Sequence, residues 1–219
     1  MWGEQIAKVL GAVPAIIWAA LAAYVIYLLR GTFPSVVARL GSFEGFGLKL
    51  SMSTQALDAA VELARKTTSP DLVVPEEDRK RALARTERER KLFEGAEILW
   101  VDDRPSNNRN EARILRGFGA LITFAASTGE ALEAIERGRE QGAPFHVILS
   151  DISRSPPDAE ADAGLRMLAA LREHHVTIPV ILYVARVHPG PAPDGAFGIT
   201  NRPDELLQKV TDALGRTRS

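Results

Sequence analysis

The chain of 219 residues contains no cysteine. Disulfide bonds, thiolate metal sites and thiol catalysis are therefore excluded, and the absence fits a reducing compartment. An excess of charge of one sign is also lacking, because 27 basic and 28 acidic residues leave a formal net charge of -1. A nearly neutral chain has no overall field that would attract nucleic acid, so we expect no nucleic-acid partner.

Long uncharged apolar runs are absent except at one place, residues 9–29. About 20 such residues cross the hydrocarbon core of a bilayer, so residues 1–30 are predicted to be a transmembrane anchor. The alternatives are a cleaved signal peptide, whose apolar core is usually shorter, and a buried core helix. Basic residues Arg30, Arg39 and Lys49 follow the run. The positive-inside rule then predicts a single-pass protein of the bacterial inner (plasma) membrane with a cytoplasmic C-terminal domain.

Residues 31–69 are interpreted as a juxtamembrane connector made of short apolar pieces. Phe46–Leu50 alternates like a short strand, and Ser53 or Thr54 begins a helix that ends near Arg65. The connector has no obvious core of its own. Self-association into a homo-oligomer is compatible with this pattern.

Residues 70–95 are interpreted as a charged helical linker. Twelve of the sixteen residues from Glu76 to Lys91 are charged, and many lie at spacings that pair opposite charges on a helix. The only apolar positions in this run are Ala82, Leu83 and Ala84. They are too few for a coiled-coil seam, so the pattern predicts a solvated helical spacer.

From residue 96 to residue 219, apolar strands alternate with amphipathic helices. The predicted strands are residues 97–101, 121–124, 145–149, 178–183 and 196–200, and the predicted helices are residues 107–116, a helix capped by Ser127, residues 163–173 and a helix from Pro203. This alternation is typical of an α/β domain with a parallel sheet. We therefore expect a doubly wound, five-stranded parallel sheet of the flavodoxin-like kind.

Acidic residues follow two of these strands, where each strand ends. Asp102 and Asp103 come directly after the first strand, and Asp151 follows the third. With the strand order 2-1-3-4-5, the first and third strands are neighbours, and their carboxyl ends form a crevice. Three carboxylates there repel one another unless a cation such as Mg²⁺ neutralises them. The alternative is that the acidic pair only begins a loop and caps the next helix.

Over about Ala96–Gly215 the chain resembles the receiver domain of bacterial two-component response regulators. The matching elements are the acidic pair after Leu99-Trp100-Val101, Asp151 after Val147–Ser150, Pro179-Val180-Ile181, Gly195-Ala196 and Arg202-Pro203. The resemblance implies a phosphoacceptor at Asp151 and a Mg²⁺ ion held directly by Asp103 and Asp151, through water by Asp102, and by the backbone carbonyl of Ser153. It also implies a histidine kinase or another signalling protein as a partner.

The chain departs from the receiver pattern at the positions that contact a phosphoryl group. Val184 occupies the place of the family's serine or threonine, and Arg202 occupies the place of its lysine. Arginine keeps the positive charge and can fork onto phosphate, but with another geometry. Residues 185–195 contain three prolines and are too few for the usual fourth helix, and the loop at residues 152–163 is longer than usual.

Three functional hypotheses follow. The first is a membrane-anchored signalling protein that is phosphorylated on Asp151 in a phosphorelay. The second is a phosphorylation-independent pseudo-receiver that acts as a membrane adaptor. The third is a Mg²⁺-dependent phosphohydrolase or nucleotide-processing effector. Against the third, no Gly-rich phosphate loop follows the first strand, where Arg104-Pro105-Ser106 stands instead, so an enzyme is not expected.

Overall fold

The computed structural model describes residues 46–67, 70–151, 163–187 and 191–218. The chain divides into two compact units, Met1–Leu48 and Lys49–Ser219. The predicted transmembrane anchor at residues 1–30 lies outside the described residues. Among the residues that are described, no helix is both long and apolar enough to cross a membrane.

The second unit is built around a parallel sheet of five strands. The strands are β1 (Glu97–Val101), β2 (Leu121–Ala125), β3 (Val147–Ser150), β4 (Val180–Tyr183) and β5 (Gly198–Thr200). Their order is β2-β1-β3-β4-β5, and every pair of neighbours is parallel. β3 and β4 are buried along their whole length, as expected of apolar strands covered on both faces. The predicted doubly wound, flavodoxin-like sheet is therefore confirmed.

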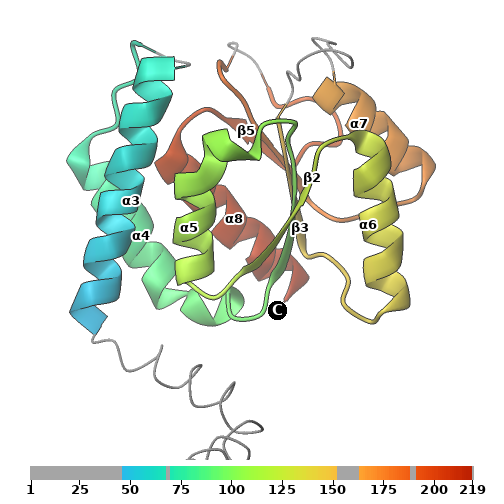
Figure 1. The fold of residues 1–219 in the computed structure, drawn as a ribbon, viewed down its shortest axis with the longest axis horizontal. Helices are drawn as coiled ribbons and strands as arrows, with labels where there is room; N and C mark the ends of the chain where they lie inside the picture. The colour runs from blue at the N-terminus through green and yellow to red at the C-terminus, as the bar shows by residue number, and fades with distance from the viewer. Residues whose placement is uncertain (1–45, 68–69, 152–162, 188–190, 219) are drawn as a thin grey trace, which may run out of the picture. The chain divides into compact units, whose positions relative to one another are not determined.

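Helices cover both faces of this sheet (Figure 1). α5 (Arg109–Gly117) and α8 (Pro203–Thr217) lie on one face, and α6 (Thr128–Glu140) and α7 (Ala163–Glu173) lie on the other. The first face buries Trp100 with Ile114 and Leu207, and the second buries Leu99 with Met167. α7 has the predicted bounds, whereas α5 begins later than predicted because Pro105–Asn108 forms a separate 3₁₀ turn.

The region before the sheet contains two helices, α3 (Phe46–Thr67) and α4 (Glu76–Arg88), and a 3₁₀ turn at Arg90–Leu92. The prediction of a short strand at Phe46–Leu50 is wrong, because α3 begins at Phe46. Five alternating residues are a weak strand signal, and the segment runs without a proline into strong helix formers.

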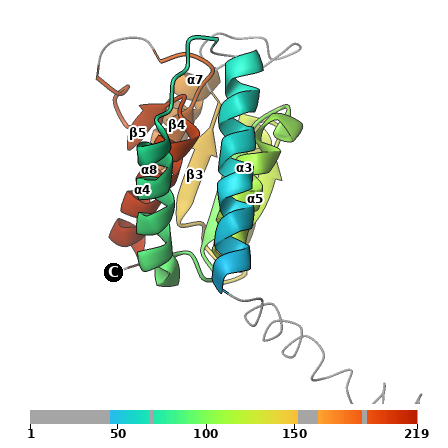
Figure 2. The ribbon, with the colours of Figure 1, turned by 90° about the vertical axis from the view of Figure 1, so that its left-hand side faces the viewer.

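α4 has one buried side, so the prediction of a spacer solvated all round is also wrong. Ala82, Leu83 and Thr86 are buried, and α4 lies beside α8 (Figure 2). The Thr86 hydroxyl donates to the Ala82 carbonyl oxygen at 3.0 Å, which satisfies this polar group inside the interface. Leu57 of α3 and Leu83 of α4 belong to the same core as Trp100. The two helices therefore extend the first face of the sheet.

Candidate functional site

The predicted acidic residues lie at the carboxyl ends of two neighbouring strands. β1 pairs with β3 so that Val101 lies opposite Ser150. The Asp151 backbone N–H donates to the Val101 carbonyl oxygen at 3.2 Å, and the Asp102 N–H donates to the Ala125 carbonyl oxygen at 2.9 Å. The sequence therefore placed Asp102 and Asp151 at adjacent strand ends correctly.

Asp102 is buried and holds the start of the following turn. Its Oδ1 accepts a hydrogen bond from the Arg104 backbone N–H at 2.6 Å, and its Oδ2 accepts one from the Asn108 side-chain amide. Both contacts stabilise the loop and 3₁₀ turn that lead into α5, because an aspartate that accepts from the backbone N–H two residues on forms an Asx-turn. Asp102 therefore holds the loop that begins after β1, as the alternative expected, whereas α5 itself has Asn108 at its N-cap position and no side-chain cap hydrogen bond.

Asp103 and Asp151 are both partly exposed at this edge. Asp103 Oδ2 lies 3.8 Å from Arg104 Nε. Carboxylate oxygens are the donors that Mg²⁺ prefers, so the chemistry of the two residues fits this ion. Within the described part of the chain, however, no three His, Cys, Asp or Glu side chains are grouped so that they could hold a metal ion. Ser153, the fourth predicted ligand, lies outside the described residues, so the magnesium site stays a prediction.

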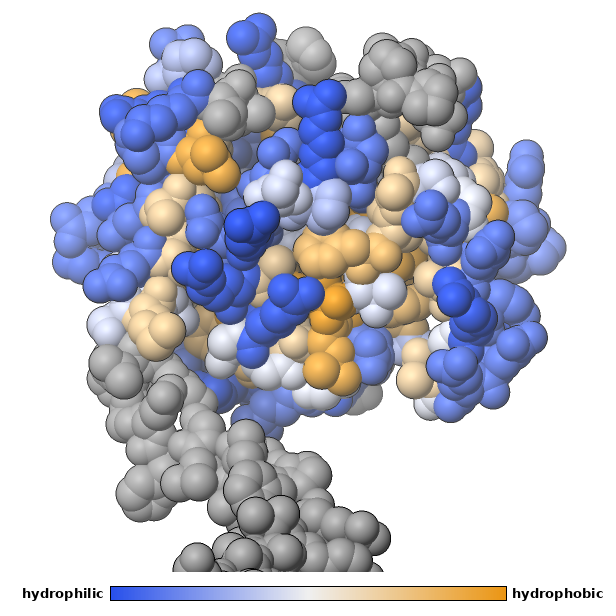
Figure 3. Space-filling model, viewed as in Figure 1, coloured by the Kyte–Doolittle hydropathy of each residue, from blue (hydrophilic) through white to orange (hydrophobic). Residues whose placement is uncertain are grey.

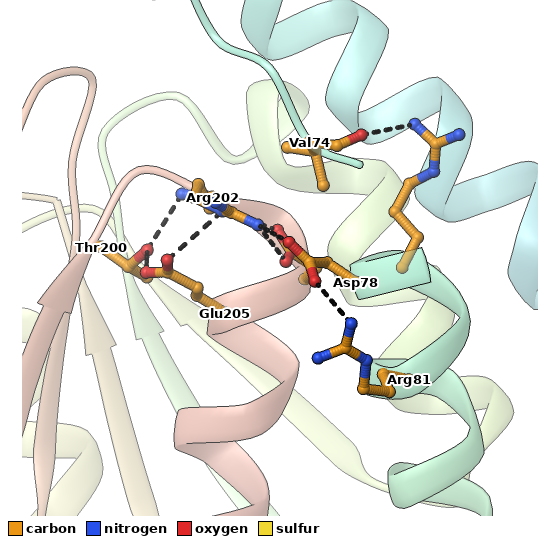
Figure 4. A network of polar contacts seen from close by, with 8 residues as sticks. Val74, Asp78, Arg81, Thr200, Arg202 and Glu205 are labelled. Carbon is orange, nitrogen blue, oxygen red and sulfur yellow. Dashed lines mark hydrogen bonds and ion pairs between the residues drawn. The ribbon is translucent and has the colours of Figure 1, made fainter. Parts of the chain in front are cut away.

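Arg202 lies between β5 and α8, and three carboxylates surround it (Figure 4). Its guanidinium donates through Nη2 to Asp204 Oδ2 at 2.7 Å and through Nε to Asp204 Oδ1 at 3.2 Å. Nη2 also donates to Asp78 Oδ2 of α4 at 3.1 Å, and Nε lies 3.3 Å from Glu205 Oε1. The hydrogen bond to Asp204 is the largest cause of a raised Arg202 pKa. This cation therefore has partners of its own within the chain.

The segment around Arg202 is fixed by Thr200, the last residue of β5. The Thr200 hydroxyl accepts from the Arg202 backbone N–H at 3.0 Å and donates to Glu205 Oε2 at 2.7 Å. Asp204 and Glu205 occupy the first turn of α8, where the helix dipole favours acidic residues. The same two acids thus lie at the positive end of the α8 dipole and bind Arg202, which explains locally why the guanidinium turns toward them.

Val184, in the place of the family's hydroxyl residue, is 8% exposed and packs in the core on the α6–α7 face. Its backbone N–H donates to the Thr200 carbonyl oxygen at 3.0 Å. The side chain offers no hydrogen bond to a ligand at the carboxyl edge. Val184, which departs from the family's residue in the sequence, is therefore a buried apolar residue in the fold.

A buried polar pair at the end of β4 was not found from the sequence. The Tyr183 hydroxyl donates to Glu111 Oε1 of α5 at 2.8 Å, and Glu111 is only 4% exposed. Burial raises the pKa of Glu111, and it also raises the pKa of Tyr183. Within the described residues, Glu111 Oε2 and the Trp100 indole N–H are buried without hydrogen-bond partners. The available signal was an acidic residue one turn before Leu115 on the apolar side of α5.

No family model matches the chain, and no curated protein matches it. Several solved receiver domains are similar to part of it. The receiver domain of the Francisella response regulator 1452 is 22% identical, and the alignment covers 57% of this chain and 100% of that one, with a TM-score of 0.47. A CheY-like receiver domain protein from Methanospirillum hungatei is 22% identical over 56% of this chain and 96% of that one, with a TM-score of 0.43.

A third similar structure is a response regulator protein of Thermotoga maritima in complex with Mg²⁺-BeF. It is 23% identical, and the alignment covers 54% of this chain and 98% of that one, with a TM-score of 0.42. The fold of the present chain is established independently by its strand order and register.

Proposed function

We propose that this chain is a membrane-anchored signalling adaptor whose receiver-like domain is a pseudo-receiver. In this proposal a partner protein binds the domain without a phosphoryl group on Asp151, and the domain turns over no substrate. The N-terminal apolar run would tether it to a bacterial inner membrane, with the receiver-like domain in the cytoplasm. The observation that carries the proposal is the pairing of Arg202 with Asp78, Asp204 and Glu205.

A phosphoryl group on Asp151 would need donors that are available at the carboxyl edge. Arg202 is held through Nε and Nη2 by Asp204, whose side chain is 1% exposed, and turning the guanidinium toward Asp151 would break these bonds. A buried acceptor left without its partner costs about 1–3 kcal/mol, and a charged one costs more. Val184 supplies no hydroxyl to compensate. Both features support a domain that does not rely on the phosphoryl switch.

The second candidate is a phosphorelay receiver, and the adjacent strand ends of Asp102 and Asp151 favour it. It would take a phosphoryl group from a histidine kinase, with Mg²⁺ held by Asp103 and Asp151. The similar Thermotoga maritima protein was solved in complex with Mg²⁺-BeF, and that complex is a property of the Thermotoga maritima protein alone. The two candidates share one fold and differ in whether Asp151 reacts.

The deciding experiment is incubation of the purified full chain with Mg²⁺ and acetyl phosphate, followed by intact-mass measurement. The pseudo-receiver proposal expects no added phosphoryl group. A phosphoryl gain that disappears in Asp151→Asn would replace it with the phosphorelay candidate. The double variant Val184→Thr, Arg202→Lys restores the family's residues. A phosphoryl gain in this variant alone would show that these two positions are the reason for inactivity.

A further inference from the structure

β2 is an edge strand of the sheet, and its outer side is open in the described residues. Its five residues, Leu121–Ala125, include no charged residue and no proline. Leu121 is 52% exposed, and Ile122, Thr123 and Phe124 are at least partly exposed. Figure 3, viewed as Figure 1 is, shows apolar residues gathered over β2 between the charged surfaces of its neighbours. Natural edge strands usually carry a lysine, a proline or a bulge that prevents pairing with another chain.

The hydrogen bonds of β2 show which backbone groups point outward. The Leu121 N–H donates to the Ala96 carbonyl oxygen, and the Ala125 carbonyl oxygen accepts from the Asp102 backbone N–H. In a parallel strand each residue directs both backbone groups to one side and its neighbour directs both to the other. Ile122 and Phe124 therefore direct their N–H and C=O groups away from β1. Only the Ile122 carbonyl has a partner among the described residues, the Arg116 guanidinium at 3.3 Å.

We infer that this edge is the contact between two copies of the chain, with β2 paired antiparallel to β2 of the second copy about a two-fold axis at Thr123. Ile122 of each copy then lies opposite Phe124 of the other. Because these are the outward-directed residues, the pairing forms four intermolecular hydrogen bonds, two in each Ile122–Phe124 pair. The five strands of each copy become one continuous sheet of ten.

The second copy fits this edge because the strand is complementary to itself. A two-fold axis perpendicular to the sheet keeps the faces of both copies on the same sides, so Ile122 packs against Phe124 on the face of the Trp100 core. Leu121 lies opposite Ala125 on the other face, and the two exposed Thr123 side chains meet on the axis. Arg116 also lies over the Phe124 ring, 5.7 Å from its centroid, which fixes that side chain beside the edge.

The absence of cysteine makes this contact directly testable by cross-linking. A Thr123→Cys chain places its single thiol on the two-fold axis, at a non-hydrogen-bonded position where side chains across the strands lie about 4.5 Å apart. The control is Leu165→Cys, which places the thiol at a 40%-exposed position on α7. With diamide as the oxidant, we expect the purified full Thr123→Cys chain to form disulfide dimers at least tenfold faster than the control. Equal rates, or no dimer from Thr123→Cys, would overturn the inference.

Charge variants at the same position give a second test that does not depend on a disulfide. Thr123 is exposed, so Thr123→Lys and Thr123→Glu should leave the folded chain intact, which circular dichroism would check. Two like charges meet on the axis in each homodimer, so neither variant should capture its own differently tagged copy. Co-expression of the two variants should restore capture, because opposite charges then face each other. Undiminished capture of Thr123→Lys by itself would contradict the pairing. The inference does not rest on the proposed function, since none of these residues belongs to the acidic edge.

Discussion

The carboxyl edge of the sheet has two ends that behave differently. At the β1–β3 end, Asp102 and Asp151 follow adjacent strands as the receiver resemblance implies. At the β4–β5 end, Val184 is apolar and buried, and Arg202 is bound by three carboxylates. One end therefore keeps acidic residues at two adjacent strand ends, and at the other end the cation is bound by carboxylates of the same chain. The difference indicates that acids at strand ends alone do not establish a switch.

The N-terminal helices account for part of this difference. α4 supplies Asp78 to Arg202, and α4 lies beside α8 over most of its length (Figure 2). The β4–β5 end is thus tied to the helices that precede the sheet.

The largest expected effect is at Arg202. In Arg202→Met, Asp204 stays buried without its cation, so the free energy of unfolding should fall by about 3 kcal/mol. Asp78→Ala is the matched control, because it removes one partner and leaves the Asp204 pair intact. Urea denaturation of both variants measures the difference. Equal losses in the two variants would mean that Asp204 does not depend on Arg202.

A smaller effect is expected at the acidic end. Asp102→Ala removes the acceptor for Arg104 and Asn108, and it should lower the free energy of unfolding by about 1–2 kcal/mol, as loss of a buried hydrogen-bond acceptor does. Asp103→Ala should change it by less than about 0.5 kcal/mol, as expected for surface substitutions. Urea denaturation of both variants and the native chain, without added metal, measures these differences. Stabilisation by Asp102→Ala would instead indicate that repulsion among the acids dominates, as in an unfilled cation site.

The fold could be predicted from the sequence because its signals are local and redundant. Buried runs such as Val147–Ser150 were recognisable as strands, and the Ser127 cap does accept the Glu130 N–H at 3.1 Å. Strands that alternate with helices then leave few possible topologies. The positions of Asp102 and Asp151 followed directly from the strand ends.

The partners of the site residues could not be predicted in the same way. The Arg202–Asp78 pair joins residues 124 positions apart, and the pairing depends on α4 lying against α8. That packing was missed because α4 buries only a few side chains, one of which, Thr86, is polar. Glu111 was missed for a related reason, since the sequence gives no sign that Tyr183 lies across from it. Long-range polar contacts leave no periodic pattern.

The buried pair of Tyr183 and Glu111 should make the free energy of unfolding of the chain depend on pH. Burial raises the pKa of Glu111 above its usual value near 4.5, so the folded chain holds this proton more tightly than the unfolded chain does. The contribution to stability is complete below the unfolded pKa and is lost as pH rises through the raised folded pKa. Glu111→Gln keeps an acceptor for Tyr183 and cannot ionise. The free energy of unfolding of Glu111→Gln minus that of the native chain should therefore be larger at pH 7 than at pH 4.

The measurement is urea denaturation between pH 4 and pH 8, with the exposed Glu136→Gln as the control. The control should follow the native curve throughout. A Glu111→Gln curve that also runs parallel to the native one would show that Glu111 does not titrate differently in the folded chain.

The smallest effect concerns how α4 is attached to α8. Arg85 Nη2 lies 2.5 Å from Asp212 Oδ1, but both side chains are at least a third exposed. Such pairs contribute about 0.2–1 kcal/mol, so Asp212→Asn should lower the melting temperature only slightly, and added salt should remove the difference. Leu83→Ala, at a position 3% exposed, should lower it much more, because it leaves a cavity between the helices. If Asp212→Asn were the more damaging change, charge rather than apolar packing would hold α4 at the β4–β5 end.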